Sequence, residues 1–159
     1  MSFQQRKILV STASFATPYA DGDNVGGLIE VSPAPTTGGA GYKFQCDCLV
    51  DESNVGPDLN IVWFSSRPTG TYTDNAPVVF SDADKKLIVG VWDIDAADWI
   101  TIASTKLVDY SALQKIMGAI PLNPAQPTIY GSVVARSAWT ATAAQQLNIA
   151  LGFEDTPGN

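Results

Sequence analysis

The stretch that decides the fold is Tyr42-Lys43-Phe44-Gln45-Cys46-Asp47-Cys48-Leu49-Val50. Every second residue of this stretch, from the tyrosine to the valine, is apolar or a cysteine. Successive side chains of a strand point to opposite faces of a sheet, so the alternation predicts a strand with these five side chains on one buried face. Residues 59–63 and 147–153 alternate in the same way, which makes β-structure the dominant expectation.

Further strands are expected on either side of these three. Together they make about eight, at residues 6–14, 26–32, 42–50, 59–63, 86–94, 99–105, 128–137 and 147–153. Loops rich in Gly, Pro, Asp and Asn separate them, which is typical of a sandwich, a jelly roll or a barrel. Helix is scarce. Ser81 and Asp84 have the spacing of a capping box for one turn, and residues 111–117 and 141–146 are candidates for two more short helices.

The length of 159 residues suits one domain, residues 1–159, with enough buried surface to fold without disulfides. Within it we expect residues 1–7 to form an extended N-terminal arm and residues 154–159 a flexible tail. Hydrophobic residues at 45% and charged residues at 16% are typical of a globular protein rather than a disordered one.

Charge and hydropathy exclude two classes of partner. The net charge is −7 and the nine basic residues are scattered, whereas nucleic-acid binding needs clustered Lys and Arg. No apolar run approaches the ~18 residues that span a membrane. The first residues also lack the basic and apolar order of a signal peptide, so we expect synthesis and retention in a cytoplasm.

No catalytic, metal or cofactor site is expected. The chain has no histidine, which removes the commonest general base and the commonest metal ligand. Asp21-Gly22-Asp23-Asn24 resembles the start of a calcium loop, but Ser32 stands where the twelfth-position Glu is required, so a tight turn explains the residues better. Cys46 and Cys48 lack the further thiols or histidines of a metal site and are interpreted as small core residues.

The acidic group Asp93, Asp95 and Asp98 is the nearest approach to a catalytic pattern, because paired carboxylates hydrolyse glycosides. Asp93 and Asp95 are two residues apart and therefore share one strand face, opposite Trp92 and Ile94. That is the pattern of a solvated outer face followed by a turn. We therefore do not expect an enzyme.

Loops and the N-terminal arm remain as places for protein contacts. Residues 65–77 form the longest irregular stretch, and such loops tend to be contact surfaces. Of the four tryptophans, Trp63, Trp92 and Trp99 lie in strand patterns typical of the core, and Trp139 is the one expected to be exposed. The candidate contact residues are Phe3, Arg6, Lys7, Arg67, Tyr72, Asp74 and Trp139.

Residues 19–27, Tyr-Ala-Asp-Gly-Asp-Asn-Val-Gly-Gly, resemble a motif that opens a family of small structural proteins of tailed bacteriophages. The similarity continues in order through residues 71–77, 82–84, 87–91, 98–99, 128–134 and 147–151. The resemblance transfers Tyr19, Gly22, Asp23, Gly26 and Gly27 as a structural turn, in which the glycines permit positive φ or a close backbone approach.

This resemblance implies a jelly-roll-like β-sandwich that serves as a capsid cement or decoration protein. Proteins of this kind bind the major capsid protein and sister copies, often as trimers, on the exterior of the virion head. The family offers no catalytic residues and no cofactor. Two alternatives stay open from the sequence: a carbohydrate-binding module of a host-recognition device, and a minor tail component.

Overall fold

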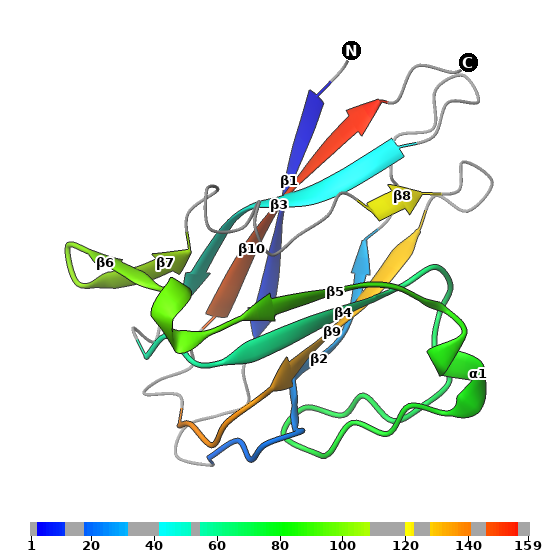
Figure 1. Ribbon diagram of the computed structural model, residues 1–159, viewed down its shortest axis with the longest axis horizontal. Coiled ribbons are helices and arrows are strands. Elements are labelled where there is room, and N and C mark those ends of the chain that lie inside the picture. Colours follow the sequence, from blue (N-terminus) through cyan, green and yellow to red (C-terminus); the bar gives the residue numbers. More distant parts are fainter. Residues whose placement is uncertain are drawn as a thin grey trace.

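The computed structural model describes residues 3–11, 18–31, 42–51, 55–108, 120–122, 128–140 and 146–155, and these form two antiparallel sheets packed face to face (Figure 1). The first sheet has the order β1 (Phe3–Ser11), β10 (Gln146–Asp155), β3 (Tyr42–Asp51), β7 (Thr105–Val108) and β6 (Ile100–Ile102), with β8 (Ile120–Leu122) also on β3. The second has the order β2 (Asn24–Val31), β9 (Ile129–Ala135), β4 (Leu59–Phe64) and β5 (Ile88–Ile94). The all-β prediction is confirmed.

The pairing of the strands is that of a jelly roll. β1 pairs with β10, β2 with β9, β3 with β7 and β4 with β5, so the chain folds back on itself about the connection between β4 and β5. The four pairs make one long antiparallel ribbon. Because β10 also pairs with β3, and β9 with β4, this ribbon is rolled into two sheets. Antiparallel strands that exchange between two sheets in this way define the jelly-roll architecture.

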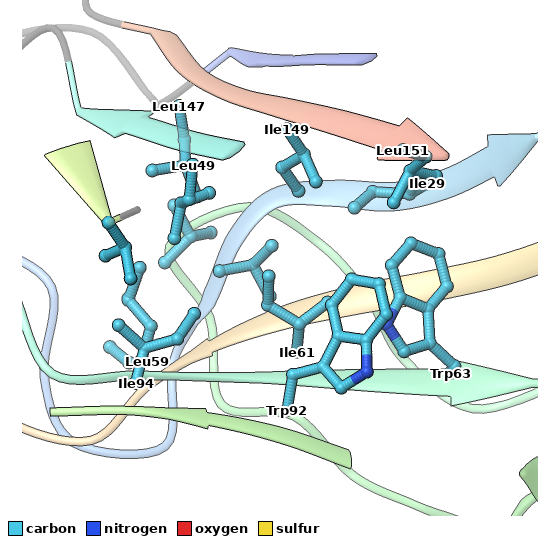
Figure 2. Close-up of a cluster of buried hydrophobic side chains, with 14 of the residues drawn as sticks. Ile29, Leu49, Leu59, Ile61, Trp63, Trp92, Ile94, Leu147, Ile149 and Leu151 are labelled. Atoms are coloured by element: carbon cyan, nitrogen blue, oxygen red, sulfur yellow. The ribbon is translucent and has the colours of Figure 1, made fainter. Parts of the chain in front are cut away.

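The core lies between the two sheets. Leu49, Leu147, Ile149 and Leu151 of the first sheet face the side chains of the second, as Figure 2 shows. The second sheet contributes Ile29, Leu59, Ile61, Trp63, Trp92 and Ile94. The two indole rings meet edge to face, with centroids 4.9 Å apart. Burial of these large apolar groups is the main force that holds the sheets together.

Gly131 on β9 makes room for one of the two indoles. It lies directly across from Trp63 in the sheet. A Cβ at this position would come within 2.7 Å of the Trp63 ring, a distance that real Cβ contacts do not show. The absence of a side chain on β9 therefore allows a tryptophan on β4.

One register prediction is wrong at the C-terminal end of β3. The five alternating side chains at residues 42–50 were expected on one face, but Leu49 is completely buried in the core and Val50 is not part of it. The register shifts between Cys46, which pairs with Leu151, and Cys48, which pairs with Ala150. Such a bulge inserts one residue and reverses the faces beyond it.

The segment 99–105, expected as one strand, is instead the first half of a hairpin. β6 ends at Ile102 and β7 begins at Thr105, and the two strands pair with each other. Ala103 and Ser104 form the turn with φ of 49° and 69°. Positive φ at both central residues is the mark of a type I′ turn, which joins strands with the correct twist.

The N-terminal arm is also corrected. Residues 3–7 belong to β1 and pair with residues 154 to 150 of β10, inside the domain's own sheet. Residues 154 and 155, assigned to the flexible tail, belong to β10.

The helical segments within the described ranges are α1 (Asp82–Lys85), at the predicted capping box, and the 3-10 helix η1 (Ala96–Asp98). Residues 111–117, a candidate helix, lie outside the described residues. Residues 141–145 also lie outside, and Gln146 begins β10.

Candidate interaction surfaces

The turn at residues 19–27 is built as the glycine pattern predicts. Gly22, Gly26 and Gly27 have φ of 87°, 78° and 84°, a region that side chains other than glycine rarely adopt. Gly26 and Gly27 form a bulge, because Val25 pairs with Val133 of β9 and Leu28 pairs with the next residue, Ser132. Asp23 is buried, and its carboxylate accepts a hydrogen bond of 2.7 Å from the amide of Ala20.

The tyrosine that opens this motif is buried against Trp139. The two rings stack with centroids 4.9 Å apart and planes 18° from parallel. Their backbones form a two-way bridge, with the amide of each hydrogen-bonded to the carbonyl of the other at 2.8 and 3.2 Å. Trp139 has the largest exposed fraction of the four tryptophans, but at 8% it is still buried, because Tyr19 covers it. The expectation of an exposed indole at this position is therefore wrong.

Asp74 joins the turn to the loop that follows β4. One of its carboxylate oxygens accepts a hydrogen bond from the Tyr19 hydroxyl at 2.9 Å and another from the amide of Gly26 at 2.7 Å. We call the assembly of residues 19–27 and 71–78 the corner. Figure 1 shows the loop, in green, along the bottom of the view beneath the second sheet.

Asn24 is the buried centre of the corner. Its side-chain amide donates to the carbonyl of Tyr72 at 2.7 Å, and its side-chain oxygen accepts from the hydroxyl of Ser132 at 2.9 Å. Its backbone exchanges hydrogen bonds with Ala76 and Asn75. A polar side chain with no exposure is stable in such a place because both its ends are hydrogen-bonded.

A second buried polar group, Asp84, organises the rest of the same loop. Its carboxylate accepts hydrogen bonds from the amides of Thr69 (2.7 Å), Gly70 (2.8 Å) and Ser81 (3.2 Å). Burial by itself would raise the pKa of Asp84, but the hydrogen bonds from Thr69, Ser81 and Gly70 outweigh it and lower the pKa to about 2. The carboxylate is therefore charged at neutral pH and fixes the loop.

Tyr72, a predicted contact residue, is half-buried and is bonded to both Asn24 and Asp84. Its ring packs against Phe64 and Phe80, with centroids 5.7 and 6.3 Å away. Its hydroxyl donates weakly to Asp84 at 3.4 Å. Burial, and then the negative charge of Asp84, raise the pKa of the Tyr72 phenol.

Arg67 is the predicted contact residue that the structure leaves on the surface. Its side chain is 66% exposed and pairs with Glu30 at 3.2 Å. The guanidinium also lies over the ring of Tyr130, 5.9 Å from its centroid. Phe3, Arg6 and Lys7 lie in β1 by their backbone, and their side chains are outside what the structure describes.

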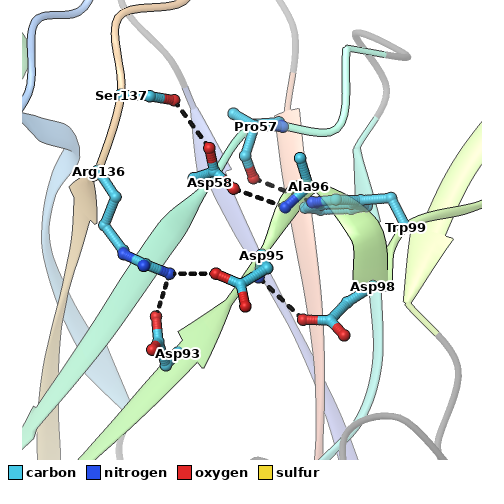
Figure 3. Close-up of polar contacts among 9 residues, drawn as sticks. All are labelled: Pro57, Asp58, Asp93, Asp95, Ala96, Asp98, Trp99, Arg136 and Ser137. Atoms are coloured by element: carbon cyan, nitrogen blue, oxygen red, sulfur yellow. Dashed lines mark hydrogen bonds and ion pairs between the residues drawn. The ribbon is translucent and has the colours of Figure 1, made fainter.

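One arginine holds two of the three carboxylates at the end of β5. Arg136 forms ion pairs with both Asp93 and Asp95, the second at 2.7 Å (Figure 3). The hydrogen bond to Asp95 is the largest cause that raises the pKa of Arg136. Asp98 caps η1 by accepting from the amide of Asp95 at 2.8 Å, so each of these carboxylates has a structural partner.

The structure also shows exposed apolar side chains that the alternation pattern missed. On β5, Val89 and Val91 are exposed, and on β6, Ile100 and Ile102 are 40% and 55% exposed. Val79 in the loop before α1 is exposed as well. The four residues of β5 and β6 were assigned to strands, but nothing in the sequence indicates that these strands are edges. Val79 was not assigned to any strand.

Within the described ranges, no three or more His, Cys, Asp or Glu side chains are placed to hold a metal ion. The same ranges contain no helix long and apolar enough to cross a membrane. Comparison with known proteins finds no matching family model, no similar curated protein and no similar solved structure.

Proposed function

We propose that this protein is a structural protein of a tailed-bacteriophage head, a cement or decoration protein that stabilises the capsid. After synthesis in the host cytoplasm it binds the major capsid protein and sister copies on the outer surface of the virion. Its function is contact between proteins and not catalysis.

The observation that carries the proposal is the corner. Residues 19–27 and 71–77 are two of the stretches that carry the resemblance to the phage family, and they are about 50 residues apart in the sequence. In the fold they bond to each other through Asp74 and Asn24. A resemblance whose separate pieces form one hydrogen-bonded unit is better supported than one whose pieces are scattered. Jelly rolls are also a common architecture of viral capsid proteins.

The carbohydrate-binding alternative receives no support from the tryptophans. All four, Trp63, Trp92, Trp99 and Trp139, are buried, with exposed fractions of 0% to 8%. Sugar-binding surfaces use exposed aromatic rings for stacking, and none of these indoles offers one.

The test is binding of the purified protein to purified capsids that lack it, measured by co-sedimentation and then by electron microscopy. We expect saturable binding and regular density on the head. Absence of binding at tens of micromolar, or density on the tail alone, would overturn the proposal.

A matched pair of variants tests whether Arg67, the exposed cation of the loop after β4, takes part in capsid binding. Arg67 and Lys85 are both exposed, and each is paired with one carboxylate. Arg67→Glu should weaken capsid binding at least tenfold if the loop faces the capsid, while Lys85→Glu should leave it unchanged. Equal effects of the two substitutions would show that general charge, and not the loop, is responsible.

A further inference from the structure

The strands at the edges of the two sheets, β1, β6, β2 and β5, differ in how they are protected. Open edges offer unpaired backbone groups to other chains, and natural proteins block them with charges, bulges or covering segments. β1 carries Arg6 and Lys7, and β5 carries Asp93 and an irregularity opposite Trp63 and Phe64. β2 has the bulge at its two glycines and is covered at its start by the loop of the corner.

Within the described residues, β6 has none of these devices and is protected only by its short length of three residues. It consists of Ile100, Thr101 and Ile102, all exposed, without a charge, a proline or a glycine. Among the strands that the structure describes, β7 alone pairs with it. Figure 1 shows the β6–β7 hairpin projecting from the left side of the domain.

The backbone of Thr101 points to the open side of this edge. Ile102 and Thr105 flank the type I′ turn and are the hydrogen-bonded pair that closes it. Hydrogen-bonded and non-hydrogen-bonded pairs alternate along an antiparallel ladder, so Thr101 and Lys106 are a non-hydrogen-bonded pair. The N–H and C=O of Thr101 are therefore directed away from β7.

We infer that β6 is a self-association surface and pairs antiparallel with β6 of a second copy, about a two-fold axis at Thr101. A two-fold axis at Thr101 makes the contact isologous, so each residue pair away from the axis occurs twice. Thr101 then lies opposite Thr101 of the second copy and exchanges two hydrogen bonds with it. Ile100 lies opposite Ile102 of the second copy, and such pairs of β-branched side chains stabilise sheets.

The lysines on the neighbouring strands do not oppose this pairing. Thr101 lies beside Lys106 on β7, which lies beside Asp51 on β3. Across the joined sheet the two Lys106 residues are three strand spacings apart, about 14 Å. That distance exceeds the Debye length of about 8 Å at physiological salt, and each lysine is closer in register to the aspartate of its own copy.

This pairing would be the surface through which sister copies meet on the capsid. Only this biological role rests on the proposed capsid function; the pairing itself does not. Three residues from each copy form a small contact that is weak between free molecules. On a capsid lattice many such contacts act together, so a weak interface is sufficient there.

Disulfide trapping tests the pairing. In Thr101→Cys the two cysteines would face each other with Cα atoms about 5.5 Å apart, within the range of about 4.4–6.8 Å that a disulfide requires. Ser104→Cys is the matched control, because Ser104 is exposed in the same hairpin but would lie about 20 Å from its counterpart. Under mild oxidation at micromolar concentration, Thr101→Cys should give at least tenfold more covalent dimer than Ser104→Cys.

A second measurement does not depend on replacing Thr101. Copies with Ile100→Cys mixed with copies with Ile102→Cys should form disulfides with each other in preference to their own kind. Equal trapping by Thr101→Cys and Ser104→Cys, together with no preference in the mixture, would overturn the inference. Capsid binding is measured separately, so a protein that traps as predicted but does not bind capsids would contradict the proposed function alone.

Discussion

Asp84 illustrates at the scale of one residue how a buried charge can hold a loop in place. It has no exposed surface and receives three backbone hydrogen bonds. We predict that Asp84→Asn lowers the free energy of unfolding by about 2–4 kcal/mol, because the amide loses the charge and turns its own N–H group toward backbone donors. Urea denaturation measures this change.

Asp82→Asn is the control for that substitution. Asp82 is two residues away on the same short helix, and its side chain is 94% exposed. Its ion pair with Lys85 lies at the surface, where such pairs contribute about 0–1 kcal/mol. A loss for Asp84→Asn no larger than that for Asp82→Asn would contradict the role assigned to Asp84.

The lowered pKa of Asp84 also predicts how the free energy of unfolding depends on pH. The pKa of Asp84 is lowered from 3.8 to about 2 in the folded protein. A lowered pKa means that the unfolded chain binds the proton first, so the stabilisation is complete above pH 3.8 and is lost as the pH falls to about 2. We expect stability to decline over this interval in the wild type and to decline less steeply in Asp84→Asn, as followed by circular dichroism. Parallel curves for the two proteins would contradict the prediction.

At the scale of elements, the β6–β7 hairpin has a turn that its residues disfavour. Ala103 and Ser104 both adopt positive φ, where residues with a Cβ are strained. Asn-Gly is the sequence that this turn type prefers. We predict that the double substitution Ala103→Asn and Ser104→Gly raises the free energy of unfolding by about 1–2 kcal/mol.

The matched control places the same two residues in η1, as Ala96→Asn and Ala97→Gly. Both alanines are exposed, and neither has positive φ, so no strain is available to relieve. Urea denaturation of the two variants compares them directly. Stabilisation by both, or by neither, would show that turn strain is not the cause.

The hairpin also shows what the sequence can predict about elements. The sequence pattern predicted eight segments that each overlap an observed strand, because burial of one face constrains every second residue, but it did not predict β8. It missed the end of β6 at Ile102, since Ala-Ser carries no turn signal. It also misplaced Val50, because a bulge depends on the strand paired with it and leaves no mark in the local sequence.

The candidate interaction surfaces, like the strands, could be predicted only in part from the sequence. The glycines of residues 19–27 indicated the turn, because positive φ restricts the choice of residue. The burial of Trp139 could not be deduced, since its cover comes from Tyr19, 120 residues away in the sequence. The exposure of Ile100 and Ile102 depends on the order of strands in the sheet, which alternation does not encode.

At the scale of the whole molecule, the nested pairing makes the N-terminus part of the fold. β1 and β10 are the first and last strands, and their pairing joins Phe3 to Glu154. The outermost pair of a nested arrangement closes the longest chain segment, so it gains least from local contacts and depends on the whole core being formed. Residues 3–7 thus stabilise the first sheet and are not a detachable arm.

The prediction that follows concerns deletion of residues 1–7. It removes five of the nine paired positions between β1 and β10, those from Phe3 to Lys7, and exposes the edge of β10. We expect the free energy of unfolding to fall by about 3 kcal/mol or more, which urea denaturation measures, because a single substitution already costs about 0.5–3 kcal/mol and the deletion removes several paired residues at once. Arg6→Gln with Lys7→Gln keeps the backbone of β1 and removes its charges, so the free energy of unfolding of this variant should change by less than about 0.5 kcal/mol.

Capsid binding by the two variants separates two roles of β1. Loss of binding with the deletion alone indicates that the fold is required, whereas loss with the double substitution indicates that the basic side chains touch the capsid. A deletion variant as stable as the full chain would contradict the place of β1 in the sheet.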